Sequence, residues 1–138
     1  MPTIKQYEVA DHHEVLEFIR KATTATEINE EVIKNSILIK KNTSVIGMIA
    51  FEAFNHIGMI RYFLYDQLLM PDLLVNMFFE LYAGAKKSGI NQLIVMVNSP
   101  YAYQLFELLG FMEIKKSINF KELGITNSER TSLMSIKL

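Results

Sequence analysis

The side chains that could do chemistry are few, and their types exclude several kinds of site. The chain has 138 residues and no cysteine, so thiolate nucleophiles, disulfides and cysteine-based metal sites are excluded. His12 and His13 are adjacent, and adjacent residues do not share a face of a helix, so this pair is a poor chelate. We therefore expect no metal site.

Acidic and basic side chains interrupt the apolar middle of the chain, and they are the candidates for acid–base catalysis. Glu52 is either a general base facing a cleft or the solvated end of a strand. Asp66 directly follows a β-rich run, which favours a loop cap over a catalytic role. Arg61 looks like a buried cation that either pairs with Glu52 across neighbouring strands or holds an anionic ligand. The pair is the preferred interpretation.

An alternation of strands and helices must position these residues. Hydrophobic periodicity and turn residues predict strands at 3–9, 36–40, 45–54, 57–65, 91–97, 112–120 and 131–138, and helices at about 11–22, 27–35, 72–87 and 100–109. Asp11 is the predicted N-cap of the first helix, with Glu14 completing a capping box. An antiparallel meander followed by a βαβ crossover predicts one α/β (α+β) domain over residues 1–138. Its sheet would be mixed, mostly antiparallel, of about seven strands, with helices on both faces.

The charge balance and the apolar pattern exclude other classes of function. Fourteen Lys and Arg against fifteen Asp and Glu give a net charge of −1, too little positive charge for a nucleic-acid-binding face. The most apolar region, 45–81, contains several charged residues, so no transmembrane helix fits. The first residues lack the apolar stretch of a signal peptide, and we expect a cytoplasmic protein.

Two segments resemble the GCN5-related N-acetyltransferase (GNAT) superfamily. They are Ser-Gly-Ile-Asn at 88–91 with the strand that follows, and Leu-Phe-Glu-Leu-Leu-Gly-Phe at 105–111. The resemblance in element order covers nearly the whole chain. It implies the GNAT fold, acetyl-CoA as co-substrate, and a small-molecule or peptide amine as acceptor.

The resemblance also implies a glycine-rich loop whose N–H groups bind the CoA diphosphate at the start of the third helix. Counting back from Gly89 places this loop on residues without a glycine at either glycine position, namely Leu69, Met70, Pro71, Asp72, Leu73 and Leu74. Pro71 removes one N–H donor, and Asp72 brings a carboxylate to the place where the diphosphate would dock. The alternative interpretation is that Pro71 and Asp72 simply begin the helix, with Asp72 as its cap.

Further site residues follow from the same resemblance. The pantetheine arm would lie along the main chain of Tyr62, Phe63 and Leu64, in an opening between strands 57–65 and 91–97. A tyrosine in the fourth helix would act as general acid, but Phe106 occupies the matching position. Phe106 has no proton to give, so we expect it only to contact CoA. Tyr103 or Tyr101 could replace the acid if the thioester sat differently; otherwise both pack. Asn98 and Ser99 lie near the asparagine that often begins this helix.

Two functions remain open on this sequence. One is an amine N-acetyltransferase with an unusual CoA site, and the other is a degenerate, non-catalytic module that does not bind CoA in the usual way. The third helix adds an expectation about assembly. Val75, Phe79 and Tyr82 form a second apolar stripe, which either the C-terminal strands or a second copy of the chain should bury. We expect a homodimer.

Overall fold

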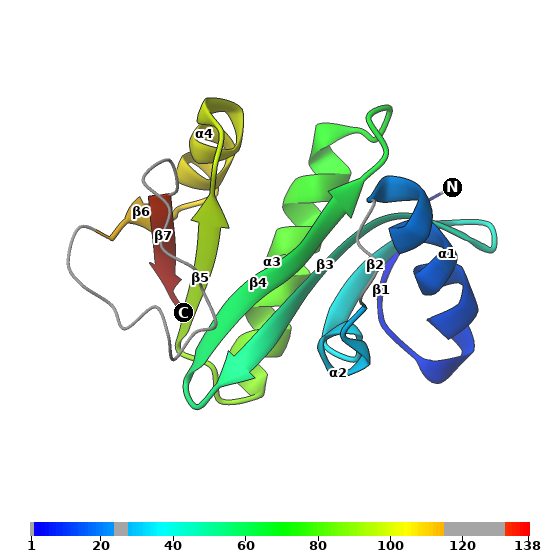
Figure 1. The fold of residues 1–138 in the computed structure, drawn as a ribbon, viewed down its shortest axis with the longest axis horizontal. Coiled ribbons are helices and arrows are strands. Elements are labelled where there is room, and N and C mark those ends of the chain that lie inside the picture. Colours follow the sequence, from blue (N-terminus) through cyan, green and yellow to red (C-terminus); the bar gives the residue numbers. More distant parts are fainter. Residues whose placement is uncertain (1, 24–27, 115–131) are drawn as a thin grey trace. The chain divides into compact units, whose positions relative to one another are not determined.

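A seven-stranded sheet is the frame of this protein in the computed structural model, which describes residues 2–23, 28–114 and 132–138 (Figure 1). The strand order is β1-β2-β3-β4-β5-β7-β6. The strands are β1 (Thr3–Gln6), β2 (Ser36–Lys41), β3 (Ser44–Phe54), β4 (Ile57–Tyr65), β5 (Gln92–Val97), β6 (Met112–Glu113) and β7 (Ser132–Lys137). The helices are η1 (Val9–Asp11, a 3₁₀ turn), α1 (His12–Ala22), α2 (Glu30–Ile33), α3 (Pro71–Lys87) and α4 (Pro100–Leu108).

The predicted fold class is confirmed. Strands β4 and β5 run parallel, while the pairs β1–β2, β2–β3, β5–β7 and β6–β7 are antiparallel. The chain divides into two compact units, which we call unit one (Met1–Glu52 and Arg61–Gly84) and unit two (Ala53–Ile60 and Ala85–Leu138). The single domain expected over residues 1–138 stays a prediction.

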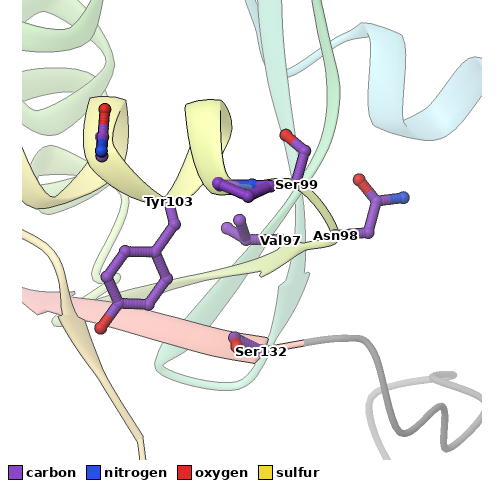
Figure 2. Close-up of a pocket in the computed structure, with 7 residues that line it drawn as sticks. Val97, Asn98, Ser99, Tyr103 and Ser132 are labelled. Atoms are coloured by element: carbon purple, nitrogen blue, oxygen red, sulfur yellow. The ribbon is translucent and has the colours of Figure 1, made fainter.

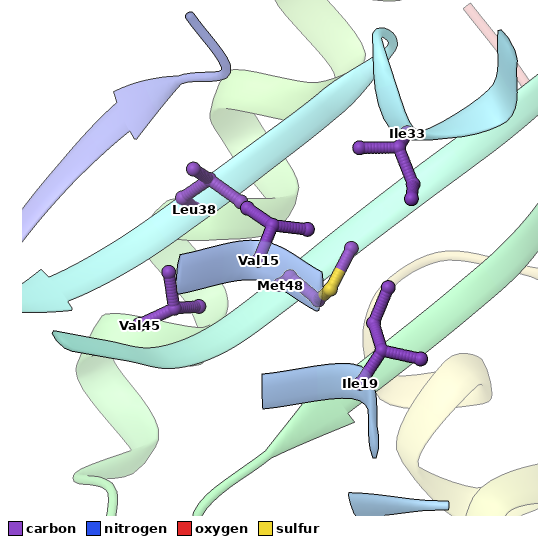
Figure 3. Packing of buried hydrophobic residues seen from close by; sticks show 6 residues of the cluster. All are labelled: Val15, Ile19, Ile33, Leu38, Val45 and Met48. Atoms are coloured by element: carbon purple, nitrogen blue, oxygen red, sulfur yellow. The ribbon is translucent and has the colours of Figure 1, made fainter. Parts of the chain in front are cut away.

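Unit one is organised around apolar side chains from two helices and two strands. The cluster in Figure 3 joins α1, α2, β2 and β3 through Val15, Ile19, Ile33, Leu38, Val45 and Met48. Successive side chains point to opposite faces of the sheet, and consecutive residues of β2 and β3 are buried, so both faces are covered there. Leu38, Val45 and Met48 lie on the face that meets α1. The turn between β2 and β3 includes Asn42 at a φ of 59°, a conformation that asparagine adopts more readily than most residues.

The predicted N-cap position of Asp11 is confirmed, but its predicted capping box with Glu14 is wrong. Asp11 occupies the N-cap position of α1, but its side chain makes no capping hydrogen bond. Its buried carboxylate instead accepts hydrogen bonds from Lys5 Nζ (2.7 Å), Lys40 Nζ (2.8 Å) and the Glu8 N–H (3.0 Å). The strand predicted to reach residue 9 ends at Gln6, because Val9–Asp11 already forms the 3₁₀ turn.

Unit two is built on β5 and on two helix ends. β5 pairs with β7 along its whole length, from Gln92↔Lys137 to Val97↔Ser132, and Met59, Ile94 and Leu133 form a small core. After α3 the Ile90 N–H bonds to the Ala85 carbonyl, and Gly89 has a φ of 88°. These are the features of a Schellman ending, so the predicted end of this helix is confirmed.

Other boundaries differ from the prediction or lie outside the described residues. α2 begins only at Glu30, because Asn29 Oδ1 accepts the Glu31 and Val32 N–H groups and caps the helix there. Residue 27 lies outside the described part. The strand predicted at 112–120 is described only as β6 and Ile114, and Thr131 also lies outside the description. Among the described helices, none is long and apolar enough to cross a membrane.

Candidate functional site

A pocket of about 360 Å³ in unit two lies where β5 ends and α4 begins (Figure 2). Ser99 builds this corner, because its Oγ accepts the Ala102 N–H (3.1 Å) and its carbonyl accepts the Tyr103 N–H (3.0 Å). Pro100 then takes the first helical turn, where its missing N–H costs nothing. The lining residues are Val97, Asn98, Ser99, Pro100, Tyr103, Gln104 and Ser132.

The aromatic residues of α4 have three different environments. Tyr103 is half-buried and lines the pocket, whereas Tyr101 is 69% exposed and is absent from the lining. Phe106 is 3% exposed and packs edge-on against Phe111, with ring centroids 5.1 Å apart. The residue at the expected general-acid position is thus part of the core, and Tyr103 is the pocket tyrosine.

Phe106 is buried for a reason that belongs to the helix end. The Phe111 N–H bonds to the Phe106 carbonyl (2.9 Å), and Gly110 has a φ of 101°. This is a Schellman ending, in which the two aromatic rings supply the accompanying hydrophobic contact. The Leu-Gly-Phe run therefore has a structural role in this chain.

The Tyr103 hydroxyl is held in its protonated form. Burial raises its pKa above the ordinary value, and the nearby carboxylates of Glu113 and Glu107 raise it further. Both effects disfavour the phenolate, because it would lose solvation and face negative charge. A hydroxyl of this kind can donate a hydrogen bond at neutral pH, although its raised pKa makes it a weaker acid than an exposed tyrosine.

The loop before α3, in unit one, borders a pocket of about 590 Å³. Asp66 organises the loop as predicted, since its Oδ1 accepts the Leu68 N–H (2.9 Å) and its carbonyl accepts the Leu69 N–H (2.9 Å). The lining residues are Pro2, Lys41, Ile46, Asp66, Leu68, Leu69, Met70, Asp72 and Leu73.

The predicted capping role of Asp72 is wrong, because α3 already begins at Pro71. This places Asp72 at the second helical position and Met70 at the cap position. Asp72 is exposed in the first turn, where its negative charge complements the helix dipole. Leu74, the last residue of the predicted loop, is half-buried within the helix.

A third pocket, of about 270 Å³ and also in unit one, contains the predicted ion pair. Arg61 Nε lies 2.9 Å from Glu52 Oε1, which confirms the pairing expected across β3 and β4. The other lining residues are Asn29, Val32 and Tyr62. Glu52 as a general base stays a prediction.

The predicted pantetheine residues alternate along β4. Tyr62 and Leu64 pack against the core cluster of unit one, and the Tyr62 hydroxyl accepts the Asn29 N–H (3.0 Å). Phe63 faces Phe78, with ring centroids 5.1 Å apart. The β4–β5 ladder joins Ile57–Met59 to Gln92–Ile94. The opening between strands 57–65 and 91–97 stays a prediction.

The histidines serve local contacts. His12 lies between the Tyr7 hydroxyl (Nδ1, 2.8 Å) and the Glu30 carboxylate (Nε2, 3.0 Å). Within the part of the chain that the structure describes, no three His, Asp or Glu side chains are grouped so that they could hold a metal ion.

Sequence reasoning missed pocket residues that come from distant segments. Ser132 lines the pocket of Tyr103 because the β5–β7 register sets it opposite Val97. Lys41 and Ile46 border the pocket before α3 although they precede it by more than twenty residues. Strand alternation indicated β7, but nothing in the sequence indicated its register.

Comparisons with known proteins bear on the fold. No protein-family model and no curated protein matches the sequence. Among solved structures, N-acetylglutamate synthase from Neisseria gonorrhoeae, determined with coenzyme A and N-acetyl-glutamate, is similar over 100% of this chain (TM-score 0.79, 14% identity). This chain spans only 35% of that synthase.

Two further structures match over their whole length. A Mycobacterium tuberculosis protein determined with CoA has a TM-score of 0.75 and 13% identity, over 99% of both chains. An acetyltransferase of the GNAT family from Streptococcus pneumoniae has a TM-score of 0.72 and 17% identity, over 100% of both chains. At these identities the likeness concerns the fold alone.

Proposed function

We propose that this chain, whose fold is that of the GNAT acetyltransferases, transfers an acetyl group from a thioester such as acetyl-CoA to an amine. The observation that carries the proposal is the position of Tyr103, a half-buried tyrosine that lines a pocket at the start of α4. The acceptor would be a small-molecule or peptide amine. Similar folds in complex with CoA support the donor class.

Transfer of the acetyl group to the amine needs one proton donor and one proton acceptor. The amine nitrogen forms a bond to the thioester carbonyl carbon, and the carbon–sulfur bond then breaks. Tyr103 would donate its Oη proton to the departing sulfur, so that a neutral thiol leaves. The nitrogen would lose its proton to water.

The two pockets, each taken by itself, differ in the chemical groups that they would accept. The pocket in unit two offers neutral polar groups from Asn98, Ser99 and Tyr103, which suit an acyl thioester. The loop before α3 presents Asp66 and Asp72, whose carboxylates repel a diphosphate. No step of the proposed reaction uses the diphosphate.

Replacing Tyr103 with Phe tests the proposal. Without the hydroxyl proton we expect turnover to fall by about 100-fold, because a positioned general acid contributes at least that much. Affinity for the donor should change little. Tyr101→Phe is the matched control, since this exposed hydroxyl on the same helix lies outside the pocket lining. Thiol release from acetyl-CoA with a panel of small amines and peptides measures turnover. Equal rates for Tyr103→Phe and wild type would refute the assignment.

A second candidate is a non-catalytic binding module. The burial of Phe106 at the expected acid position favours it, as do the engaged N–H groups before α3. This candidate predicts that no amine is acetylated by any thioester donor, even where a donor binds in a calorimetric titration.

A further inference from the structure

The loop before α3 carries an inference about the acyl donor, which rests on the proposed function. We infer that the donor is recognised through its acyl and pantetheine part and not through a nucleotide diphosphate. The preferred donor class is then a thioester of a short, uncharged thiol. Three properties of the loop carry this inference: its hydrogen-bond donors, its charges and its apolar surface.

Several of the hydrogen-bond donors near this helix start are already engaged. A helix start binds phosphate through N–H groups that have no partner within the chain. Here the Leu68 and Leu69 N–H groups bond to Asp66, and the Leu73 N–H bonds to the Met70 carbonyl (3.0 Å). Pro71 has no N–H. A diphosphate that used these three donors would have to displace bonds that the chain makes to itself.

The charges that border the pocket oppose a diphosphate as well. Asp66 and Asp72 contribute two carboxylates, and Lys41 contributes one ammonium group. An ion with two negative charges would meet a lining whose own net charge is −1. Such a lining accepts neutral or cationic groups more readily than anions.

The remaining surface of the pocket is apolar. Leu68 is 92% exposed and Met70 is 64% exposed at the loop. A phosphate-binding loop has small residues at such positions, so that the ligand can approach the backbone. The apolar lining residues are Pro2, Ile46, Leu68, Leu69, Met70 and Leu73. An uncharged group that loses water on binding gains from this surface, while a diphosphate would lose hydration without replacement.

A calorimetric comparison of two donors tests the inference on the intact chain. Acetyl-CoA and S-acetylpantetheine share the acetyl thioester and the pantetheine arm, but only acetyl-CoA carries the diphosphate and the nucleotide. We expect acetyl-CoA to bind no more tightly than S-acetylpantetheine. We also expect that acetyl-CoA binding does not weaken from low to high salt, since no anion is held by opposite charge.

Charge variants of the loop sharpen the test. Asp72→Asn should tighten acetyl-CoA binding at least about threefold and leave S-acetylpantetheine unchanged, because only one of these ligands is an anion. Glu80→Gln is the matched control, an equal loss of charge at an exposed residue further along α3, and it should change neither affinity. Circular dichroism confirms that each variant is folded.

Each outcome separates this inference from the proposed function. Acetyl-CoA binding that is tenfold tighter than S-acetylpantetheine binding, and that weakens with salt, would overturn the inference while leaving acyl transfer intact. If both donors bind alike but no amine is acetylated, the inference holds and the proposed function fails. If neither donor binds at about millimolar concentration, both are wrong.

Discussion

At the residue scale, the Asp11 carboxylate is buried and connects three segments of the chain by hydrogen bonds. It is 2% exposed, yet three hydrogen bonds reach it from β1, β2 and the turn before α1. Burial, the largest influence, would raise the pKa of this carboxyl, but the bonds from Lys40, Lys5 and the Glu8 N–H outweigh it. The net effect lowers the pKa from 3.8 to about 2.

This depressed pKa predicts an acid-sensitive contribution to stability. A carboxyl whose pKa is lower in the folded state stabilises the fold above its unfolded pKa, and this is lost as the pH falls through the folded value. We therefore expect about 2 kcal/mol to be present above pH 4 and lost towards pH 2. Asp11→Asn should remove a similar amount at pH 7 and flatten this part of the pH profile, as measured by urea unfolding.

The neighbouring Glu8 provides the control for this prediction. Its carboxylate pairs with Lys5 at 3.1 Å but is 71% exposed, and exposed pairs contribute little. Glu8→Gln should change the free energy of unfolding by less than about 0.5 kcal/mol. Equal effects of the two substitutions would show that burial of Asp11 does not set the strength of its pairs.

At the element scale, α3 and α4 both end at a glycine, which allows a matched comparison. Gly89 and Gly110 both have positive φ, so alanine at either position costs about 1 kcal/mol of backbone strain. A Cβ at Gly89 meets nothing within 4 Å, but at Gly110 it would lie 3.0 Å from Ile136 Cδ1. We expect Gly110→Ala to destabilise the protein more than Gly89→Ala in thermal unfolding.

A double-mutant cycle can test whether the contact with Ile136 causes the larger destabilisation expected for Gly110→Ala. Ile136→Val removes the contacted methyl group, so it should cost less stability in the Gly110→Ala background than in the wild type. An additive cycle would mean that the contact relaxes without cost and that only the backbone conformation matters at both glycines.

At the scale of the whole molecule, α3 keeps an apolar stripe at the surface. Phe79 is 61% exposed and Val75 38%, while Tyr82 is partly buried and contacts the Phe79 ring. The helix has Asp72 in its first turn and Lys86 in its last, with Phe79 midway between them. In an antiparallel pair of α3 helices about a two-fold axis at Phe79, each Asp72 would lie opposite Lys86 of the second copy.

This arrangement predicts a homodimer that one charge can disrupt. We expect the wild type to sediment as a dimer at about 100 μM and Phe79→Glu to sediment as a monomer, because a carboxylate at the centre of the interface would be buried without a partner. Leu108→Glu is the control, since Leu108 is 86% exposed on α4. A monomeric wild type, or equal effects of both substitutions, would contradict the α3 interface.

Much of the fold could be predicted because local patterns carry it. Alternation and turn residues located the central strands, and glycine after a helical run located the ends of α3 and α4. The pairing of Glu52 with Arg61 was also predictable, because two strands joined by a tight turn have a register set by that turn. These features depend on residues close in sequence.

What the sequence could not determine depends on residues brought together from far apart. The sequence around Asp11 is typical of a helix cap, but in the folded chain its carboxylate pairs with Lys5 and Lys40 instead. Ser132 joined the pocket of Tyr103 only through the register of β5 with β7. The sequence already showed a loop without glycines before α3, but only the tertiary structure showed which N–H groups it engages and which apolar surface surrounds it. Local propensity determines the elements, whereas packing decides which side chains share a site.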